Sequence, residues 1–219
     1  MPLRRRTRES RSTVYKLCSL LLSYPDGELV AARDELADAV NELPAGGARA
    51  ALERFCAWWL AEDPLALEQG YVSTFDLDKR CGLYLTFYGE GDRRDRGVAL
   101  LRLRRLYRAA GLPQQDGELP DFLPVMLEFA ASAPSGRGEL VLREHRAAIE
   151  LLLESLRERQ SPYAWVLDAL CATLGEPSAA DRARAIKLAA TGPPQELVGL
   201  EPFAPPEVMP EIGPIGARR

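Results

Sequence analysis

The sequence of 219 residues contains one histidine, His145, and four cysteines that lie far apart. A single histidine excludes metal sites built from several imidazoles and catalytic sets that need more than one. No two cysteines have CxxC spacing, which disfavours a zinc site or a redox motif. We therefore expect four small buried thiols in a reducing compartment, and no metal site.

Long apolar runs and an excess of positive charge are also absent. No stretch approaches the roughly 20 consecutive apolar residues that span a bilayer. Only a short apolar segment follows the arginines at positions 4–6, so we expect no secretory signal. The net charge of -4 argues against a nucleic-acid partner, which requires a basic surface. We expect a cytoplasmic protein without stable membrane insertion.

What the sequence does contain is typical of one globular domain. Hydrophobic residues make up 47% of the chain and charged residues 27%, and the length suffices to bury a core. Apolar residues recur at helical spacing, and proline and glycine separate the segments. These segments include residues 13–24, 27–43, 48–61, 81–88, 97–110, 121–132, 139–159, 161–174 and 177–188. The pattern predicts an all-α, single-domain bundle of about eight helices.

The predicted helical domain covers residues 13–191. Before it, residues 4–11 form a charge run that we interpret as a mobile, solvated terminus. After it, residues 192–219 contain recurring prolines without apolar periodicity. Such a composition is typical of an extended, mobile tail.

Three places carry the signature of a helix start. In Asp63-Pro64 the aspartate is the predicted N-cap, and the proline takes the first helical position. Ser161-Pro162 repeats this arrangement. Pro124 has no amide hydrogen and fits only near a helix start, which predicts Asp121 as the N-cap. The carboxylate of Asp121 would then accept from the Leu123 amide.

Two polar turns, residues 89–97 and 118–121, interrupt the helical pattern, and binding residues often lie on such loops. Short motifs surround them in a fixed order: Asp63-Pro64-Leu65, Tyr71 with Thr74-Phe75-Asp76, Leu83-Tyr84-Leu85, Gly91-Asp92 with Arg94-Asp95-Arg96-Gly97, Gly111-Leu112, Glu118-Leu119-Pro120-Asp121 and Leu127-Glu128-Phe129. Through this ordered set the chain resembles the delta-subunit chaperones of respiratory nitrate reductase, the NarJ group within the TorD/DmsD class of molybdoenzyme chaperones.

The resemblance implies a TorD-like helical fold and a protein that is not an enzyme and holds no cofactor of its own. It implies a chaperone that binds the N-terminal peptide of the nitrate reductase catalytic (alpha) subunit. Such a chaperone keeps the immature subunit competent for insertion of the molybdenum cofactor and delays its membrane docking.

Candidate peptide-binding residues follow from the matching motifs and their neighbours: Tyr71, Phe75, Tyr88, Asp92, Arg94, Asp95, Arg96, Pro120, Asp121, Phe122, Leu123 and Glu128. Core packing is the competing interpretation for Tyr71 and Phe75. For Asp121 the alternatives are a helix cap and a charge that meets a basic group on the peptide. One residue departs from the resemblance, because Phe122 stands where the family usually carries histidine.

Two other functions stay open at this point. One is a chaperone for a different molybdoenzyme of the same class, such as a sulfoxide or N-oxide reductase. The turn at 94–97 and the block at 71–76 favour the nitrate reductase branch. The other is a small helical hydrolase that acts on a phosphorylated or nucleotide substrate through acidic residues. The single histidine and the lack of a paired-carboxylate motif speak against it.

Overall fold

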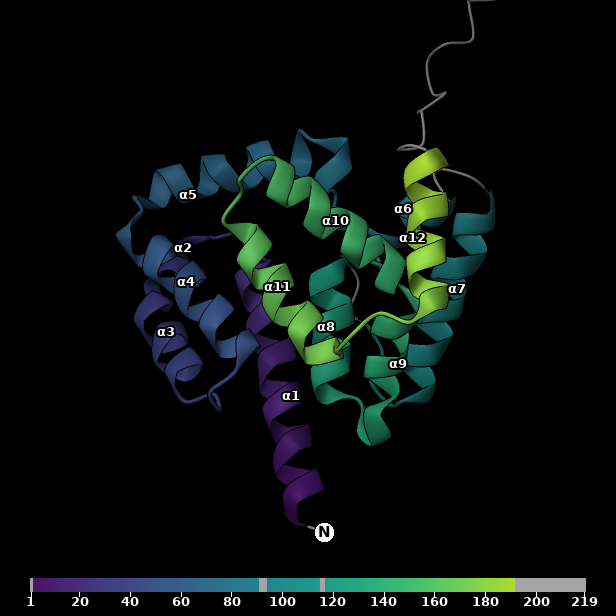
Figure 1. The fold of residues 1–219 in the computed structure, drawn as a ribbon, viewed down its shortest axis with the longest axis horizontal. Helices are drawn as coiled ribbons and strands as arrows, with labels where there is room; N and C mark the ends of the chain where they lie inside the picture. The colour runs from purple at the N-terminus through teal and green to yellow at the C-terminus, as the bar shows by residue number, and fades with distance from the viewer. Residues whose placement is uncertain (1, 91–93, 115–116, 192–219) are drawn as a thin grey trace, which may run out of the picture.

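The computed structural model describes residues 2–90, 94–114 and 117–191, and the regular secondary structure in these ranges is helical apart from one isolated β-bridge (Figure 1). The α-helices are α1 (Pro2–Leu21), α2 (Gly27–Ala31), α3 (Arg33–Asn41), α4 (Gly47–Ala61), α5 (Pro64–Tyr71), α6 (Leu85–Glu90), α7 (Arg94–Ala109), α8 (Leu123–Ser132), α9 (Arg137–Glu144), α10 (Arg146–Glu158), α11 (Tyr163–Leu174) and α12 (Ala179–Thr191). A π-helical turn (Val72–Asp76) and two 3₁₀ turns (Lys79–Cys81 and Pro134–Gly136) connect some of them. The all-α prediction is confirmed.

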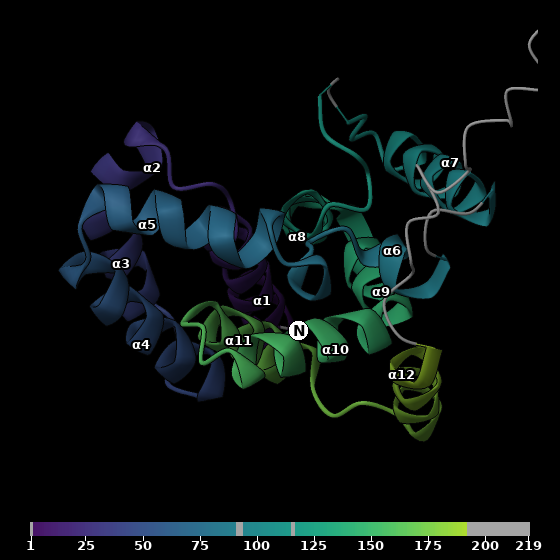
Figure 2. The same ribbon diagram turned by 90° about the horizontal axis from the view of Figure 1, so that it is seen from above.

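Helix α1 is the central element, and it packs against α8 on one side and α11 on the other (Figures 1 and 2). Leu17 and Leu21 of α1 are buried, as helical spacing predicts. Helix α4 closes the far side of α11. Cys18, Cys56 and Cys81 are buried and Cys171 is half-buried, all as free thiols. Burial raises the pKa of Cys56 and Cys81 to about 11, so these thiols are poor nucleophiles.

An aromatic cluster fills the space where α5 and the π-helical turn meet α4 and α11. The ring centroids of Tyr71 and Phe75 lie 4.8 Å apart, and Tyr163 of α11 lies 4.8 Å from Phe75. The Tyr71 hydroxyl donates to the Leu22 carbonyl at 3.1 Å. These contacts place Tyr71 and Phe75 in the hydrophobic core.

Helix α9 approaches α8 closely because Gly138 has no side chain. A Cβ built at this position would lie 2.2 Å from the Ala130 Cα and 2.9 Å from the Phe129 carbonyl oxygen. Real side chains do not tolerate such distances, so only glycine allows the two backbones to meet here. This contact fixes how far α9 stands from α8.

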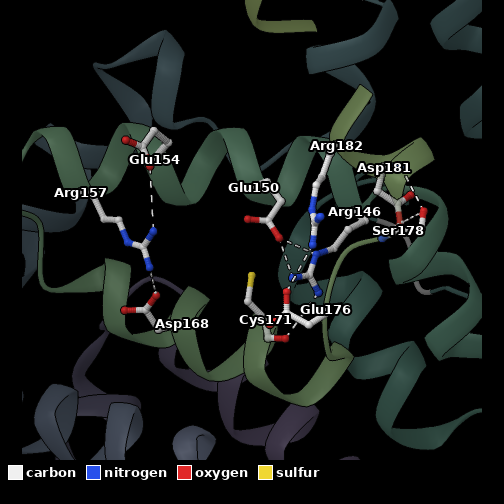
Figure 3. A network of polar contacts seen from close by, with 10 residues as sticks. All are labelled: Arg146, Glu150, Glu154, Arg157, Asp168, Cys171, Glu176, Ser178, Asp181 and Arg182. Carbon is white, nitrogen blue, oxygen red and sulfur yellow. Dashed lines mark hydrogen bonds and ion pairs between the residues drawn. The ribbon is translucent and has the colours of Figure 1, made fainter. Parts of the chain in front are cut away.

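Polar contacts link α10 with α11, and others define the start of α12 (Figure 3). Arg146 of α10 is buried, and its Nη2 lies 2.6 Å from Glu150 Oε1. Arg157 of α10 pairs with Asp168 of α11 at 2.6 Å. At the start of α12, Ser178 Oγ accepts from the Asp181 amide at 3.1 Å, and Asp181 Oδ2 accepts from the Ser178 amide at 3.0 Å. This reciprocal cap defines where α12 begins.

Several predicted boundaries are wrong. Helix α1 begins at Pro2, so the predicted helix start at residue 13 is wrong and the charge run at 4–11 is helical. The segments 27–43 and 139–159 are each two helices, the first interrupted at Ala32 and the second at His145. His145 has φ -97 and ψ 13, outside the helical range, and its Nδ1 contacts the Val141 carbonyl at 2.9 Å. The apolar stripe continues across each bend, which is why periodicity alone does not reveal the interruption.

The helix-start signals had mixed outcomes. Asp63 caps α5 as predicted, since its Oδ1 accepts from the Leu65 amide at 2.9 Å. Ser161 does not cap α11, which begins after Pro162 without a side-chain cap.

The predicted tail, residues 192–219, lies outside the described residues. Within the described ranges, no helix has the length and apolarity to cross a bilayer.

Candidate peptide-binding groove

A groove of about 650 Å³ lies between α1, α8 and the loop that follows α7. Side chains from three separate stretches of sequence line it: Ser19, Leu20 and Ser23 of α1; Tyr107 of α7 with Gly111, Leu112, Pro113, Gln114 and Glu118; and Phe122, Pro124, Val125, Glu128, Phe129 and Ser132 at α8. Most of this lining is apolar. Its volume is in the range of pockets that enclose small ligands or peptide side chains.

Helix α8 supplies one wall of the groove because its two faces differ. Leu123, Met126 and Leu127 are fully buried on the core side. Val125 and Glu128 stand on the opposite side at helical spacing and are only partly buried. Ser19 Oγ of α1 donates to the Pro124 carbonyl at 2.8 Å, which ties the two walls together.

The segment before α8 is held by the β-bridge between Tyr84 and Phe122. The Leu85 amide donates to the Asp121 carbonyl at 3.0 Å, and the Leu123 amide donates to the Leu83 carbonyl at 2.8 Å. The Tyr84 and Phe122 rings lie 5.2 Å apart. Phe122 therefore reaches the groove from a backbone that is fixed on both sides.

Asp121 lies beneath this bridge and is completely buried. Its Oδ2 accepts from Thr86 Oγ1 at 2.6 Å and lies 3.6 Å from Arg96 Nη2. Phe122 occupies the N-cap position of α8 without a side-chain hydrogen bond. The predicted cap at Asp121 is therefore wrong, because the bridge to Leu83 already uses the Leu123 amide. The charge of Asp121 faces Arg96 in the interior and not the protein surface.

Pro120 is held in the same way. The Tyr107 hydroxyl donates to the Pro120 carbonyl at 2.7 Å. Burial raises the pKa of Tyr107 far above its ordinary value, so it remains a donor at any physiological pH. Pro120, Asp121 and Arg96 thus support the groove from below instead of lining it.

The other predicted residues lie elsewhere. Tyr88 donates its hydroxyl to the Arg80 and Gly82 carbonyls, each at 3.0 Å. Tyr71 and Phe75 are in the core, as the competing interpretation held, and Leu123 is buried.

Asp95 lines a second hollow beside Arg102, Glu144 and His145. Arg94 is the first residue of α7. Asp92 lies outside the described residues. Of the predicted set, Phe122 and Glu128 reach the groove.

Sequence reasoning missed Leu20, Leu112, Val125 and the role of Glu118 in this groove. Phe122, Val125 and Glu128 follow one another at three-residue spacing, a signal that could have identified the α8 wall. The contribution of Leu20 depends on how α1 packs on α8, which local sequence does not encode.

Two carboxylates border the groove. Glu118 Oε1 accepts from the Tyr84 hydroxyl at 3.1 Å. Burial of Tyr84 and its bond to Glu118 raise the pKa of Tyr84 to about 12. Glu128 pairs with Lys16 of α1 at the surface. The charged residues that line the groove are thus both acidic. Among the side chains that the structure describes, no three of His, Cys, Asp or Glu form a group that could hold a metal ion.

Comparison with known proteins identifies the family. The family model described as nitrate reductase delta subunit matches residues 40–168. The nitrate reductase-like protein NarX of Mycobacterium tuberculosis is 38% identical over 160 residues, which cover 73% of this chain and 24% of NarX. The chain therefore spans about a quarter of that relative.

Two further relatives are closer in length. A Bacillus subtilis protein described as the nitrate reductase molybdenum cofactor assembly chaperone NarJ is 35% identical over 75% of this chain and 89% of its own length. The chaperone of the same description from Escherichia coli is 34% identical over 70% of this chain and 66% of its own length.

A solved structure agrees in fold. The crystal structure described as a redox enzyme maturation protein from Archaeoglobus fulgidus superposes with a TM-score of 0.54. The two are 23% identical, and the match covers 81% of this chain and 93% of that one. The family match spans more than half of the chain, and the alignment with the Bacillus relative covers 89% of that relative. The chain belongs to the nitrate reductase delta subunit family.

Proposed function

We propose that this protein is an assembly chaperone of a molybdenum-containing respiratory nitrate reductase. Family membership supports this proposal, as do relatives from two bacteria that are described as nitrate reductase molybdenum cofactor assembly chaperones. In this role the protein binds its partner and performs no reaction. The molybdenum cofactor belongs to the partner enzyme and not to this chain.

We further propose that the groove between α1 and α8 holds the N-terminal segment of the immature catalytic subunit. The observation that carries this assignment is the combination of an apolar lining with two acidic residues. A helix or extended peptide buries an apolar face in such a groove, and charges at the border set its position. The bound segment should therefore carry apolar side chains that contact Leu20, Phe122 and Val125. It should also carry a cationic side chain near Glu118 or Glu128.

A difference in affinity between the exposed segment and the segment packed in the finished enzyme would determine when the chaperone releases its partner. The chaperone binds the segment while it is exposed and loses it when the segment packs into the finished enzyme. Until then, the bound segment is unavailable for membrane docking, and the subunit remains open for cofactor insertion. Release requires a moderate affinity, about -8 kcal/mol for a micromolar complex.

Calorimetry with a synthetic peptide of the catalytic subunit's N-terminus tests the proposal. We expect binding at micromolar concentrations, and an affinity about tenfold weaker for Val125→Ala, since part of an apolar contact is lost. Leu65→Ala is the matched control, because Leu65 is exposed on α5 and does not line the groove. No heat at tens of micromolar, together with a pull-down that lacks the catalytic subunit, would overturn the function. Equal effects of the two variants would place the peptide outside this groove.

A further inference from the structure

Helix α7 concentrates positive charge in an acidic protein. It contains six arginines and one aspartate, whereas the whole chain has a net charge of -4. Two of these arginines have acidic partners in the chain: Arg96 faces the buried Asp121, and Arg102 pairs with Glu144 at the surface at 3.1 Å. The remaining charge is therefore not needed to balance acids of this fold.

Three arginines of α7 face the solvent. Arg104, Arg105 and Arg108 are exposed, and no ion pair joins them to another residue in the described part of the chain. Leu103 and Tyr107 on the opposite side are buried and attach the helix to the body. Both views place α7 at the edge of the molecule (Figures 1 and 2). The arginines thus lie on an exposed helix at the edge of the molecule, and Val98 beside them also lines the second hollow.

Aliphatic side chains lie on the same ridge as the arginines. Val98, Leu101, Arg105 and Arg108 follow one another at three- and four-residue spacing, so they share one face of the helix. Val98 is 64% exposed and Leu101 is 54% exposed. A ridge that served only as a solvated surface would gain nothing from these two side chains, because exposed apolar area is unfavourable in water.

We propose that this α7 ridge, formed by Val98, Leu101, Arg104, Arg105 and Arg108, binds the surface of an anionic phospholipid membrane. Guanidinium groups bond phosphate, and aliphatic side chains between them can enter the boundary with the acyl chains. Nucleic acid would satisfy the arginines but would leave Val98 and Leu101 in water.

The binding is peripheral and oriented. The chain has a net charge of -4, so anionic headgroups repel its acidic surfaces and attract the basic face that α7 presents. Tyr107 of the same helix lines the groove from its inner side. The ridge does not depend on the groove being occupied, and its test is independent of the proposed peptide.

Vesicle flotation tests the inference. The full chain is mixed with vesicles of phosphatidylcholine containing about a third phosphatidylglycerol, and with phosphatidylcholine alone. We expect binding to the first and not the second, weakened by salt. The Arg105→Gln, Arg108→Gln variant should bind about thirtyfold more weakly, since each arginine near an anionic surface contributes about a factor of five. Leu101→Ser should also weaken it.

Helix α12 provides matched controls. Arg182→Gln with Arg184→Gln removes the same charge from an exposed helix, and Ile186→Ser removes an aliphatic side chain that is 71% exposed. These α12 variants should bind the anionic vesicles as strongly as the wild type does. Three results would overturn the inference: no binding to anionic vesicles at low salt, equal binding to neutral vesicles, or equal losses from the α7 and α12 variants. Capture of an acidic protein by the ridge without vesicle binding would likewise refute a lipid partner.

Discussion

Asp121 brings a carboxylate into the interior of the protein, where it meets the hydroxyl of Thr86 and the guanidinium of Arg96. The second oxygen, Oδ1, has no hydrogen-bond partner among the described residues. A buried charge is costly unless it is paired, so this cluster depends on Arg96 for its stability. Through its backbone, the same residue holds the strand-like segment that presents Phe122 to the groove.

We expect Asp121→Asn to destabilise the protein by about 3 kcal/mol, because the change removes the buried negative charge that faces the largely buried Arg96. An N-cap aspartate would behave differently, since asparagine caps a helix about as well. Chemical denaturation of the variant measures the loss, with Asp63→Asn as the matched change at a true cap. Equal stability of Asp121→Asn and the wild type would mean that the buried pair contributes nothing.

The α8–α9 contact shows how one position can set the distance between two elements. Gly138 lies against the backbone of Ala130 and Phe129. Backbone atoms cannot move aside as a flexible side chain can. Any larger residue must therefore push α9 away from α8, and α8 is one wall of the groove.

Gly138→Ala should destabilise the protein by about 3 kcal/mol or more, the upper range for overpacking. Gly70→Ala serves as the control, because a Cβ at Gly70 of α5 would meet nothing within 4 Å. That substitution should be neutral or stabilising by up to about 1 kcal/mol, since alanine favours helix. Thermal and denaturant unfolding of both variants decides the matter. A harmless Gly138→Ala would show that the two helices can separate without cost.

At the scale of the whole molecule, local chemistry predicts much of the fold. Helical periodicity identifies the helical class and the buried faces, for instance Leu17 and Leu21 of α1. The cap at Asp63 also follows from its immediate neighbours. The break at His145 does not, because the apolar stripe runs through it.

The groove could be predicted only in part. Glu128 belongs to a quoted motif and Phe122 directly follows another, and both reach the groove. The role of Asp121 depends on Leu83, Leu85 and Thr86, some 35 residues earlier, and no local rule reveals that pairing. Tyr71 and Phe75 pack in the core. Aromatic residues at helical spacing can form a core or a binding surface, so their spacing alone does not distinguish the two.

Truncation tests the predicted division of the chain at residue 191. A chain that ends after Thr191 should melt within a few degrees of the full protein, because residues 192–219 carry no periodic apolar face. A second truncation, after Glu176, also removes α12 and its contacts with α10, and it should cost clearly more. Differential scanning calorimetry compares the three. A large loss from the first truncation would show that the tail packs on the bundle.

Some groove residues of α8 differ from the residues that form most of its core contacts, and this has a consequence for how such a protein can change its client. Leu123, Met126 and Leu127 are fully buried in the bundle, while Val125 and Glu128 are only partly buried and line the groove. Exposed groove residues can therefore be substituted one at a time, which changes peptide recognition with little loss of stability. Grafting only the groove positions of α1 and α8 from one relative to another should transfer client preference while melting behaviour stays that of the host.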